Sequence, residues 1–287
     1  MWVTLSLLTA FSLATSDALT KKVLRTRDEY FVAWIRLLFA LPLLVASLFF
    51  IEIPHLDRTF WLATVCALPL EILTLILYTK ALKVSPMSVT LPFLALTPLF
   101  LIITSYLILG ESVSISGTAG IVLMAAGAYT LNLHKARHSV LGPVRAILKE
   151  KGSLMMIGVA FIYSITSSLG KMAIEHSSPI FFGAFYFILV TILFTPIALK
   201  MNKWNLSFRK KDVAPFASIG LTYSIMIICH MLAISLINVA YMISIKRTSL
   251  LFGIIYGHFL FREERIAEKA VGGVIMLAGF ILIVIGN

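Results

Sequence analysis

Two adjacent basic residues, Lys246 and Arg247, lie in the middle of a long apolar run, MISIKRTSLLF, and Glu71 lies in the middle of another, LPLEILTLILY. A charged side chain inside such a run costs about 2.5–3.5 kcal/mol on insertion scales, so it needs a functional or structural partner. Arginine forms forked hydrogen bonds and lysine offers a point charge, so the pair suits an anionic group such as a carboxylate or a phosphate. Alternatively, an internal acid neutralises both cations, and Glu71 is the obvious candidate.

Other charged residues inside the apolar runs also need an explanation. Glu71 is a candidate proton-coupling residue, because a lone carboxylate in hydrocarbon stays protonated whereas one beside a cation can ionise. A fixed counter-ion to one of the cations is the alternative role for Glu71. Arg36, in WIRLLFALPLL, either meets Glu71 or extends its head group to the membrane surface. Asp17 precedes Lys21 by four residues, which indicates an ion pair at a helix end.

Small hydroxyl side chains and tyrosines are expected to line a cavity beside these charges. The hydroxyl residues recur at helical spacing in two apolar runs, and helix packing is the alternative role for them. Anchoring at the membrane interface is the alternative role for the tyrosines. The complete set of predicted substrate-binding residues is Lys246, Arg247, Glu71, Arg36, Tyr78, Tyr241, Ser12, Ser16, Ser164 and Ser168.

The composition excludes a water-soluble globular protein. The chain has 287 residues, of which 60% are hydrophobic and only 13% are charged, and its mean hydropathy is +0.99. A soluble domain carries about 25% charged residues, which form its polar shell. A bilayer core of about 30 Å is crossed by about 20 apolar residues in a helix. The sequence therefore predicts an all-α membrane protein with ten transmembrane helices, at about residues 1–20, 30–50, 60–79, 86–108, 116–133, 152–170, 179–199, 213–236, 238–260 and 268–286.

The two halves of the chain resemble each other. The segment that starts at Ala81 aligns without a gap with the segment that starts at Ala233, at an offset of 152 positions. The prediction is a first five-helix repeat at 1–133, a basic linker at 134–151 and a second five-helix repeat at 152–287. An odd number of helices in each repeat inverts one repeat relative to the other in the membrane. This is the plan of secondary transporters, whose binding site lies near the midplane between the repeats.

Each half ends with a helix closed by an acidic residue and then a glycine-rich helix. These endings read TPLFLIITSYLILGE with GTAGIVLMAAG, and SLLFGIIYGHFLFREE with VGGVIMLAG. They resemble the drug/metabolite transporter superfamily in its EamA-type ten-helix form, and Arg36 in the second run fits the same resemblance. The resemblance covers essentially the whole chain and implies transport of small metabolites, often amino acids or related compounds. The Lys246–Arg247 pair also resembles the triose-phosphate and nucleotide-sugar branch, which implies contact with a substrate phosphate.

The basic residues outside the apolar runs lie almost entirely on one side of the predicted topology, with Arg58 and Lys171 as the exceptions. The positive-inside rule then places the basic loops in the cytoplasm and both termini outside. The resemblance implies the reverse, because that family usually has cytoplasmic termini. We expect an integral protein of the plasma (bacterial inner) membrane, oriented as the charge count indicates.

These observations predict a secondary transporter (a permease, exporter or exchanger) of a small anionic or zwitterionic metabolite such as an amino acid or an organic phosphate, working by alternating access. The expected partners are this small molecule, membrane lipid and a coupling proton, without nucleic acid. A lipid or polyprenyl-carrier flippase of the same fold is the alternative, since it could use the same cationic pair. An intramembrane enzyme is less favoured, because the sequence has no H-E-x-x-H motif, paired aspartates or Ser/Lys dyad. No cofactor or metal site is predicted, and Cys66 and Cys229 both lie in apolar runs.

Overall fold

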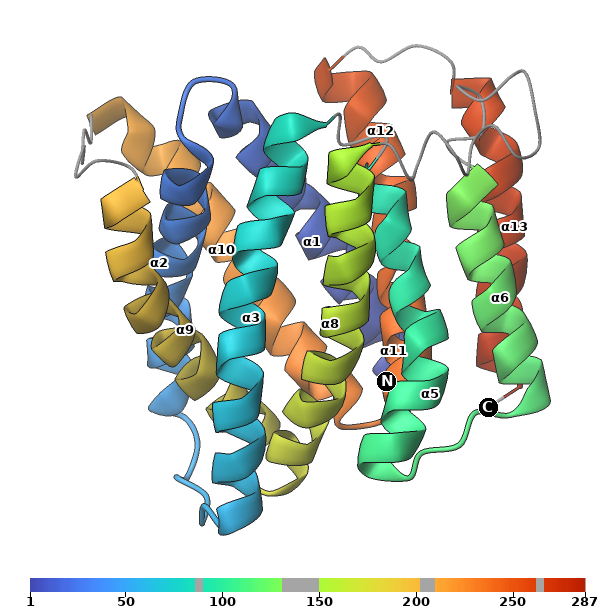
Figure 1. Cartoon of the computed structure of the whole chain (residues 1–287), viewed down its shortest axis with the longest axis horizontal. Coiled ribbons are helices and arrows are strands. Elements are labelled where there is room, and N and C mark those ends of the chain that lie inside the picture. The colour runs from blue at the N-terminus through green and yellow to red at the C-terminus, as the bar shows by residue number, and fades with distance from the viewer. Residues whose placement is uncertain (86–89, 131–149, 202–209, 262–265, 287) are drawn as a thin grey trace.

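The computed structural model describes residues 1–85, 90–130, 150–201, 210–261 and 266–286, and all regular elements within these ranges are helices (Figure 1). The first half of the chain forms α1 (Trp2–Leu24), α2 (Glu29–Leu48), α3 (Arg58–Val84), the 3₁₀ helix η1 (Leu91–Leu96), α5 (Thr97–Leu109) and α6 (Ile115–Thr130). The second half forms α8 (Lys151–Glu175), α9 (Pro179–Met201), α10 (Lys210–Ile234), α11 (Val239–Lys246), α12 (Ser249–Phe261) and α13 (Ile266–Ile285).

The helices are built to lie in lipid. Eight described segments are long and apolar enough to cross a bilayer, and Ile115–Thr130 and Val271–Ile285 are shorter apolar helices. Large apolar side chains also face outward, among them Val65, Ile103 and Phe259. A helix pairs its own backbone groups, so it can present such a surface to hydrocarbon. The chain is therefore an all-α integral membrane protein, as predicted from the composition.

The two halves are inverted relative to each other (Figure 1). In that view α1, α3 and α6 run upward and α2 and the η1–α5 segment run downward. Each counterpart in the second half runs the opposite way: α8, α10 and α13 downward, α9 and the α11–α12 segment upward. This confirms the predicted inverted five-helix repeats.

The connections between helices that the structure describes lie on two opposite faces of the bundle. The chain ends and loops 49–57, 110–114, 176–178 and 235–238 lie on one face, here called the terminus side. The opposite face, here called the basic side, carries the end of α1 with Lys21, Lys22, Arg25 and Arg27. Residues 134–149 of the predicted linker, and Glu263 and Glu264, lie outside the described residues.

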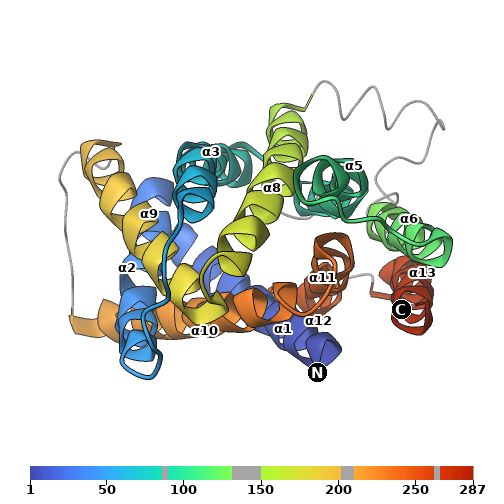
Figure 2. The same ribbon diagram turned by 90° about the horizontal axis from the view of Figure 1, so that it is seen from below.

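Contacts between the repeats follow the inverted symmetry. α3 packs along α8, and α1 packs along α10 (Figure 2). Because α1 corresponds to α8 and α3 to α10, these two contacts are equivalent in the inverted repeat. α6 packs against α13 at one end of the bundle, where the predicted glycine-rich runs meet. A Cβ built on Gly120 would lie 2.8 Å from the carbonyl oxygen of Gly279, and one on Gly127 would lie 2.7 Å from that of Gly272. The backbones approach so closely only because these positions lack side chains.

The fourth and ninth spans are each interrupted, and the interruptions are equivalent. α5 begins at Thr97 and α12 begins at Ser249, which are 152 positions apart, the offset of the repeat. In the first half the 3₁₀ segment carries Pro92, and Pro98 is the second residue of α5, so each proline removes a backbone N–H donor near the break. The second half breaks without a proline, through bonds such as Thr248 N–H to Ile245 C=O (2.9 Å) that tighten the turn.

Candidate functional site

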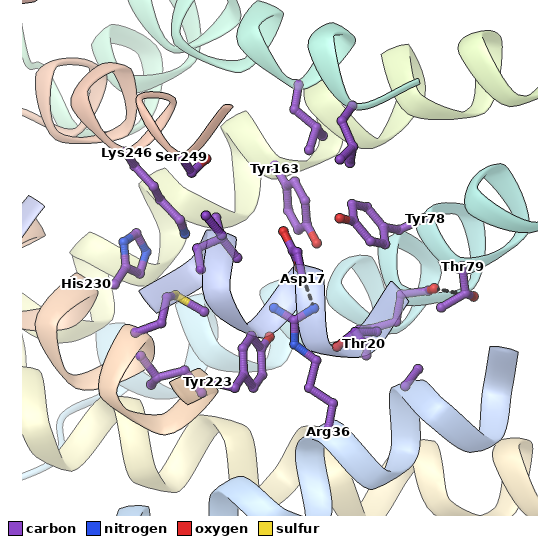
Figure 3. A pocket seen from close by; sticks show the side chains of 18 of the residues that line it. Asp17, Thr20, Arg36, Tyr78, Thr79, Tyr163, Tyr223, His230, Lys246 and Ser249 are labelled. Atoms are coloured by element: carbon purple, nitrogen blue, oxygen red, sulfur yellow. Dashed lines mark hydrogen bonds and ion pairs between the residues drawn. The ribbon is translucent and has the colours of Figure 1, made fainter. Parts of the chain in front are cut away.

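A cavity of about 560 Å³ lies between the two repeats (Figure 3). Helices of both halves line it, including both interrupted spans. Its lining includes Arg27, Asp28 and Glu29 in and beside the loop after α1, on the basic side. No described residue of the four terminus-side loops lines it, so the cavity opens toward the basic side and is closed toward the terminus side.

The mouth of the cavity is charged. The Lys83 ammonium, at the end of α3, lies 2.9 Å from the carboxylate of Glu29, at the start of α2. The hydrogen bond and the negative charge of Glu29 raise the pKa of Lys83. Lys21 and Arg27 lie at the same entrance. Asp28 lines the entrance as well and Arg27 pairs with Asp212, so a solute approaching from the basic side meets charges of both signs.

Lys246 and Arg247 lie at the interruption of the ninth span and both line the cavity. Lys246 is the last residue of α11, where the negative end of the helix dipole favours a cation. Its ammonium points into the cavity (Figure 3) and has no hydrogen-bond or ion-pair partner within the described part of the chain. The amino terminus of α12 begins at Ser249, another lining residue, and the N–H groups of Leu250 and Leu251 donate to the carbonyl oxygens of Arg247 (3.0 Å) and Thr248 (2.9 Å) across the break. The break thus gathers positive charge at mid-depth.

Arg247 is almost fully buried and bridges the two interruptions. Its guanidinium Nη2 donates to Thr97 Oγ1 at 2.9 Å, and Thr97 opens α5. Its Nε has no hydrogen-bond partner within the described residues. Arg247 is thus held by the other repeat through one nitrogen, while its Nε is a buried donor left unpaired among the described residues.

Arg36 pairs with Asp17, a partner that was not predicted for it. Arg36 Nη1 lies 2.8 Å from Asp17 Oδ1, and the guanidinium stacks over the ring of Tyr223 at 4.0 Å from the centroid (Figure 3). Both side chains line the cavity, so Arg36 does not extend to the membrane surface. The pair neutralises both charges, while Arg36 Nε remains unpaired within the described residues.

Glu71 lies in the same cavity, on α3, and is buried. Its carboxylate makes no hydrogen bond or ion pair with a described residue, so the predicted pairing with Lys246, Arg247 or Arg36 is not present. The cavity therefore holds a carboxylate on one repeat and an ammonium on the other, which are close enough for their charges to interact but are not hydrogen-bonded to each other.

Aromatic hydroxyl groups surround these charges. Tyr78 lines the cavity as predicted, and Tyr163 and Tyr223 point toward the same space (Figure 3). Tyr163 lies on the face of α8 that also presents Ser167 and Gly170 to the cavity, at helical spacing. The sequence reasoning missed Tyr163 because it chose the neighbouring face, with Ser164 and Ser168. The recurrence of residues 163, 167 and 170 was the available signal.

Five predicted binding residues lie elsewhere. The four serines are buried and do not line the cavity, and neither does Tyr241; these residues are Ser12, Ser16, Ser164, Ser168 and Tyr241. Ser168 donates to the carbonyl oxygen of Ser164 within α8, and Ser16 lies 3.4 Å from the carbonyl oxygen of Ile219 on α10. The serines serve helix packing, which was the alternative role for them.

The floor of the cavity, toward the terminus side, is apolar. Phe182, Met231 and Ile234 line it, and the ring of Phe182 packs against Phe60 at 6.3 Å between centroids. Further rings close the layer beneath: Trp61, Phe181 and Phe185. Among the described residues, no group of three or more His, Cys, Asp or Glu side chains could hold a metal ion.

Comparison with known proteins agrees with this architecture. A model of the EamA-like transporter family matches residues 1–133 and 150–285, nearly the whole chain. Solved structures with the same fold exist; one, described only as a crystal structure of a protein, has a TM-score of 0.75 at 13% sequence identity. That match covers 98% of this chain and 94% of the other, and at this identity it shows the fold alone. No curated protein gives a significant match.

Proposed function

The chain belongs to the EamA-like transporter family, and from this membership we propose that it is a secondary transporter of a small anionic or zwitterionic metabolite that carries an apolar part. An amino acid or an organic phosphate represents the chemistry that the cavity accommodates. The cargo would be bound at mid-depth and released by alternating access of the two inverted repeats.

One observation carries the proposal: Lys246 and Glu71 line the same cavity without a partner among the described residues. Charges held away from water are unfavourable unless something compensates them. A bound anion would compensate Lys246, with the positive charge of the neighbouring Arg247 as further support. A cargo ammonium, or a proton, would compensate Glu71.

The apolar floor adds a size and polarity preference. Phe182, Phe187, Met226 and Met231 all line the cavity. A purely ionic solute would leave these side chains against water, whereas a cargo with an apolar body would cover them. The anionic group would then lie at the charged belt and the apolar body on the floor.

The positive-inside rule supports a cytoplasmic position for the basic side and external termini. We propose this orientation, in the plasma (bacterial inner) membrane. The cavity would then face the cytoplasm. A tag at the C-terminus should react with an impermeant reagent added to whole cells, and a tag reachable only after permeabilisation would reverse the orientation.

Counterflow in proteoliposomes tests the function directly. Purified protein is first screened by thermal shift against anionic and zwitterionic solutes, and stabilising solutes are then assayed for exchange. Lys246→Ala and Arg247→Ala should each weaken apparent affinity at least about tenfold, because each removes a charge-assisted hydrogen bond. Lys80→Ala, which removes an exposed lysine on α3 that does not line the cavity, is the matched control.

Each other outcome has a definite meaning. Wild-type exchange in both cavity variants would refute the anionic site. Movement of a labelled lipid, without exchange of any small solute, would favour a flippase of the same fold.

A further inference from the structure

The closed face of the cavity is held by a buried ion pair between the repeats. Lys171, near the terminus-side end of α8, is buried, and its ammonium contacts the carboxylate of Glu111. Lys171 also donates to the carbonyl oxygen of Ile237 at 2.9 Å. The second carboxylate oxygen of Glu111 accepts the N–H of Val239, the first residue of α11, at 2.9 Å. One carboxylate from the first repeat thus contacts two helices of the second, α8 and α11.

The backbone of the first repeat is shaped for this contact. Gly110 ends α5 with φ of 71°, a left-handed conformation that favours glycine, and the chain turns there so that Glu111 reaches α8 and α11. The same loop is tied down again by Tyr241, whose hydroxyl accepts the N–H of Ser114 at 2.8 Å. The Asn238 side chain also donates to the carbonyl oxygen of Ser112 at 3.2 Å.

A second link joins the end of α8 to the first repeat at the surface. His176, the residue after α8, lies 2.7 Å from the carboxylate of Asp57, which caps α3. Both side chains are partly exposed, so this link is weaker than the buried one. The terminus side is therefore closed by these polar contacts in addition to the aromatic floor.

The inverted repeat should build the opposite closure from the counterpart residues, but the sequence does not supply them. At the offset of 152 positions Glu111 is matched by Glu263, whereas Lys171 is matched by Leu19. The other polar contacts are lost as well: Asn238 falls on Pro86, Tyr241 on Val89, and His176 on Leu24. The terminus-side closure thus has a chemistry that the basic-side closure cannot repeat.

We propose that Lys171 is a positioning residue that, through Glu111, holds the transporter predominantly in the state open to the basic side. Opening the terminus side separates the two residues, and a buried charge without its partner is strongly unfavourable. The opposite state gains no equivalent pair when it forms. The equilibrium between the two states is therefore biased rather than balanced.

This bias has a functional consequence that rests on the proposed transport activity. A ligand that meets its site only in a minor state binds with an apparent dissociation constant raised by the inverse of that state's population. Cargo supplied from the basic side should therefore half-saturate transport at a lower concentration than cargo supplied from the terminus side. Lys171 does not contact the cargo. It determines only on which side of the membrane the apparent affinity for the cargo is higher.

The bias is measured without cargo by cysteine labelling. Cys66 and Cys229 are replaced by Ser and Ala, and Thr166→Cys places a single thiol in the cavity wall. In sealed vesicles of known orientation, an impermeant maleimide should label this thiol much faster from the basic side. Lys171→Leu, which installs the residue of the first repeat, should raise the terminus-side rate at least about tenfold and lower the basic-side rate.

Matched variants separate a lost ion pair from general damage. Glu175→Gln removes an exposed carboxylate 4.0 Å from the same ammonium and should leave the labelling unchanged. Lys171→Arg should retain the wild-type pattern, and the exchange Lys171→Glu with Glu111→Lys should restore it in part. Glu111→Gln provides the same test from the other repeat if Lys171→Leu does not fold.

The outcomes are distinct. Unchanged labelling in both folded Lys171→Leu and Glu111→Gln would overturn the proposed bias. Absence of any solute exchange in the wild type would refute the transport function, while the labelling would still decide the bias. In active protein, Lys171→Leu should lower the half-saturating concentration on the terminus side relative to the basic side, and an unchanged ratio would contradict the proposal.

Discussion

Arg247 donates to Thr97 at 2.9 Å, and this bond joins the two interrupted helices at equivalent positions of the inverted repeats. Arg247 follows the end of α11, and Thr97 opens α5. Broken helices at mid-membrane expose backbone groups and helix ends to a cavity, which is where transporters bind their cargo. The bond therefore couples the cationic part of the cavity to the helix break of the other repeat.

Replacing Thr97 by valine removes the acceptor with little change in shape. The guanidinium of Arg247 would then lack its Nη2 partner, and a buried donor left unpaired costs about 1–3 kcal/mol. We expect Thr97→Val to lower the thermal midpoint in detergent, and a stabilising anionic cargo to recover part of the loss by pairing with Arg247. Thr97→Ser, which keeps the hydroxyl, is the control. Equal midpoints for the two variants would mean that this bond contributes nothing.

The Asp17–Arg36 pair predicts a coupling energy between two helices. Asp17→Asn leaves Arg36 without a counter-ion in a mostly buried position. Loss of one partner from a fully buried ion pair destabilises a protein by several kcal/mol. We expect a smaller loss here, because both side chains are partly exposed. Arg36→Gln should have a similar effect, and the double variant should lose less stability than the sum. Glu52→Gln, at an exposed terminus-side carboxylate, is the control. Additive losses would exclude the interaction.

The glycine contact between α6 and α13 predicts a position-specific effect of one methyl group. Gly120→Ala would place a Cβ against the backbone of Gly279, and overpacking of this kind costs about 1–3 kcal/mol. Gly158→Ala on α8, where a Cβ meets nothing within 4 Å, should be neutral or stabilising by up to about 1 kcal/mol. Thermal midpoints of the two variants in the same detergent would measure the difference. Similar midpoints would show that α6 and α13 can move apart without a loss of stability.

Asp57 predicts a pH dependence on the terminus side. The N–H of Phe60 and then His176 lower the pKa of Asp57, so its folded form is ionised to lower pH than its unfolded form. The resulting stability is present above the unfolded pKa, near 3.8, and is lost as the pH falls through the folded value. The midpoint difference between wild type and Asp57→Asn should therefore shrink as the pH falls below about 4. A difference that grows with acidity would contradict this assignment.

The spans, the duplication and the inversion could be predicted from the sequence alone. Hydropathy and the repeat offset, which aligns Glu111 with Glu263, are both properties of the chain. It also indicated the cavity charges, since Lys246, Arg247, Glu71 and Arg36 are too unfavourable in lipid to lack a role. Pairing was not predictable: Arg36 meets Asp17 rather than Glu71, because helix rotation decides which charges meet. For the same reason, Tyr241 and four serines were wrongly placed at the cavity. Lys171 was interpreted as a topology signal, whereas it makes a buried contact.

Glu71 provides the most direct test of proton coupling. It lines the cavity without a described partner, so binding or release of a proton there would change the charge that the cargo meets. Glu71→Gln keeps the shape and fixes the neutral form, so counterflow should become independent of pH between about 5 and 8 while the protein remains inserted and folded. Glu52→Gln should keep the wild-type pH profile. An unchanged profile in Glu71→Gln would assign Glu71 to cargo binding or packing. The proton would then have to be carried by another group in the cavity, for which His230, a lining residue, is a candidate.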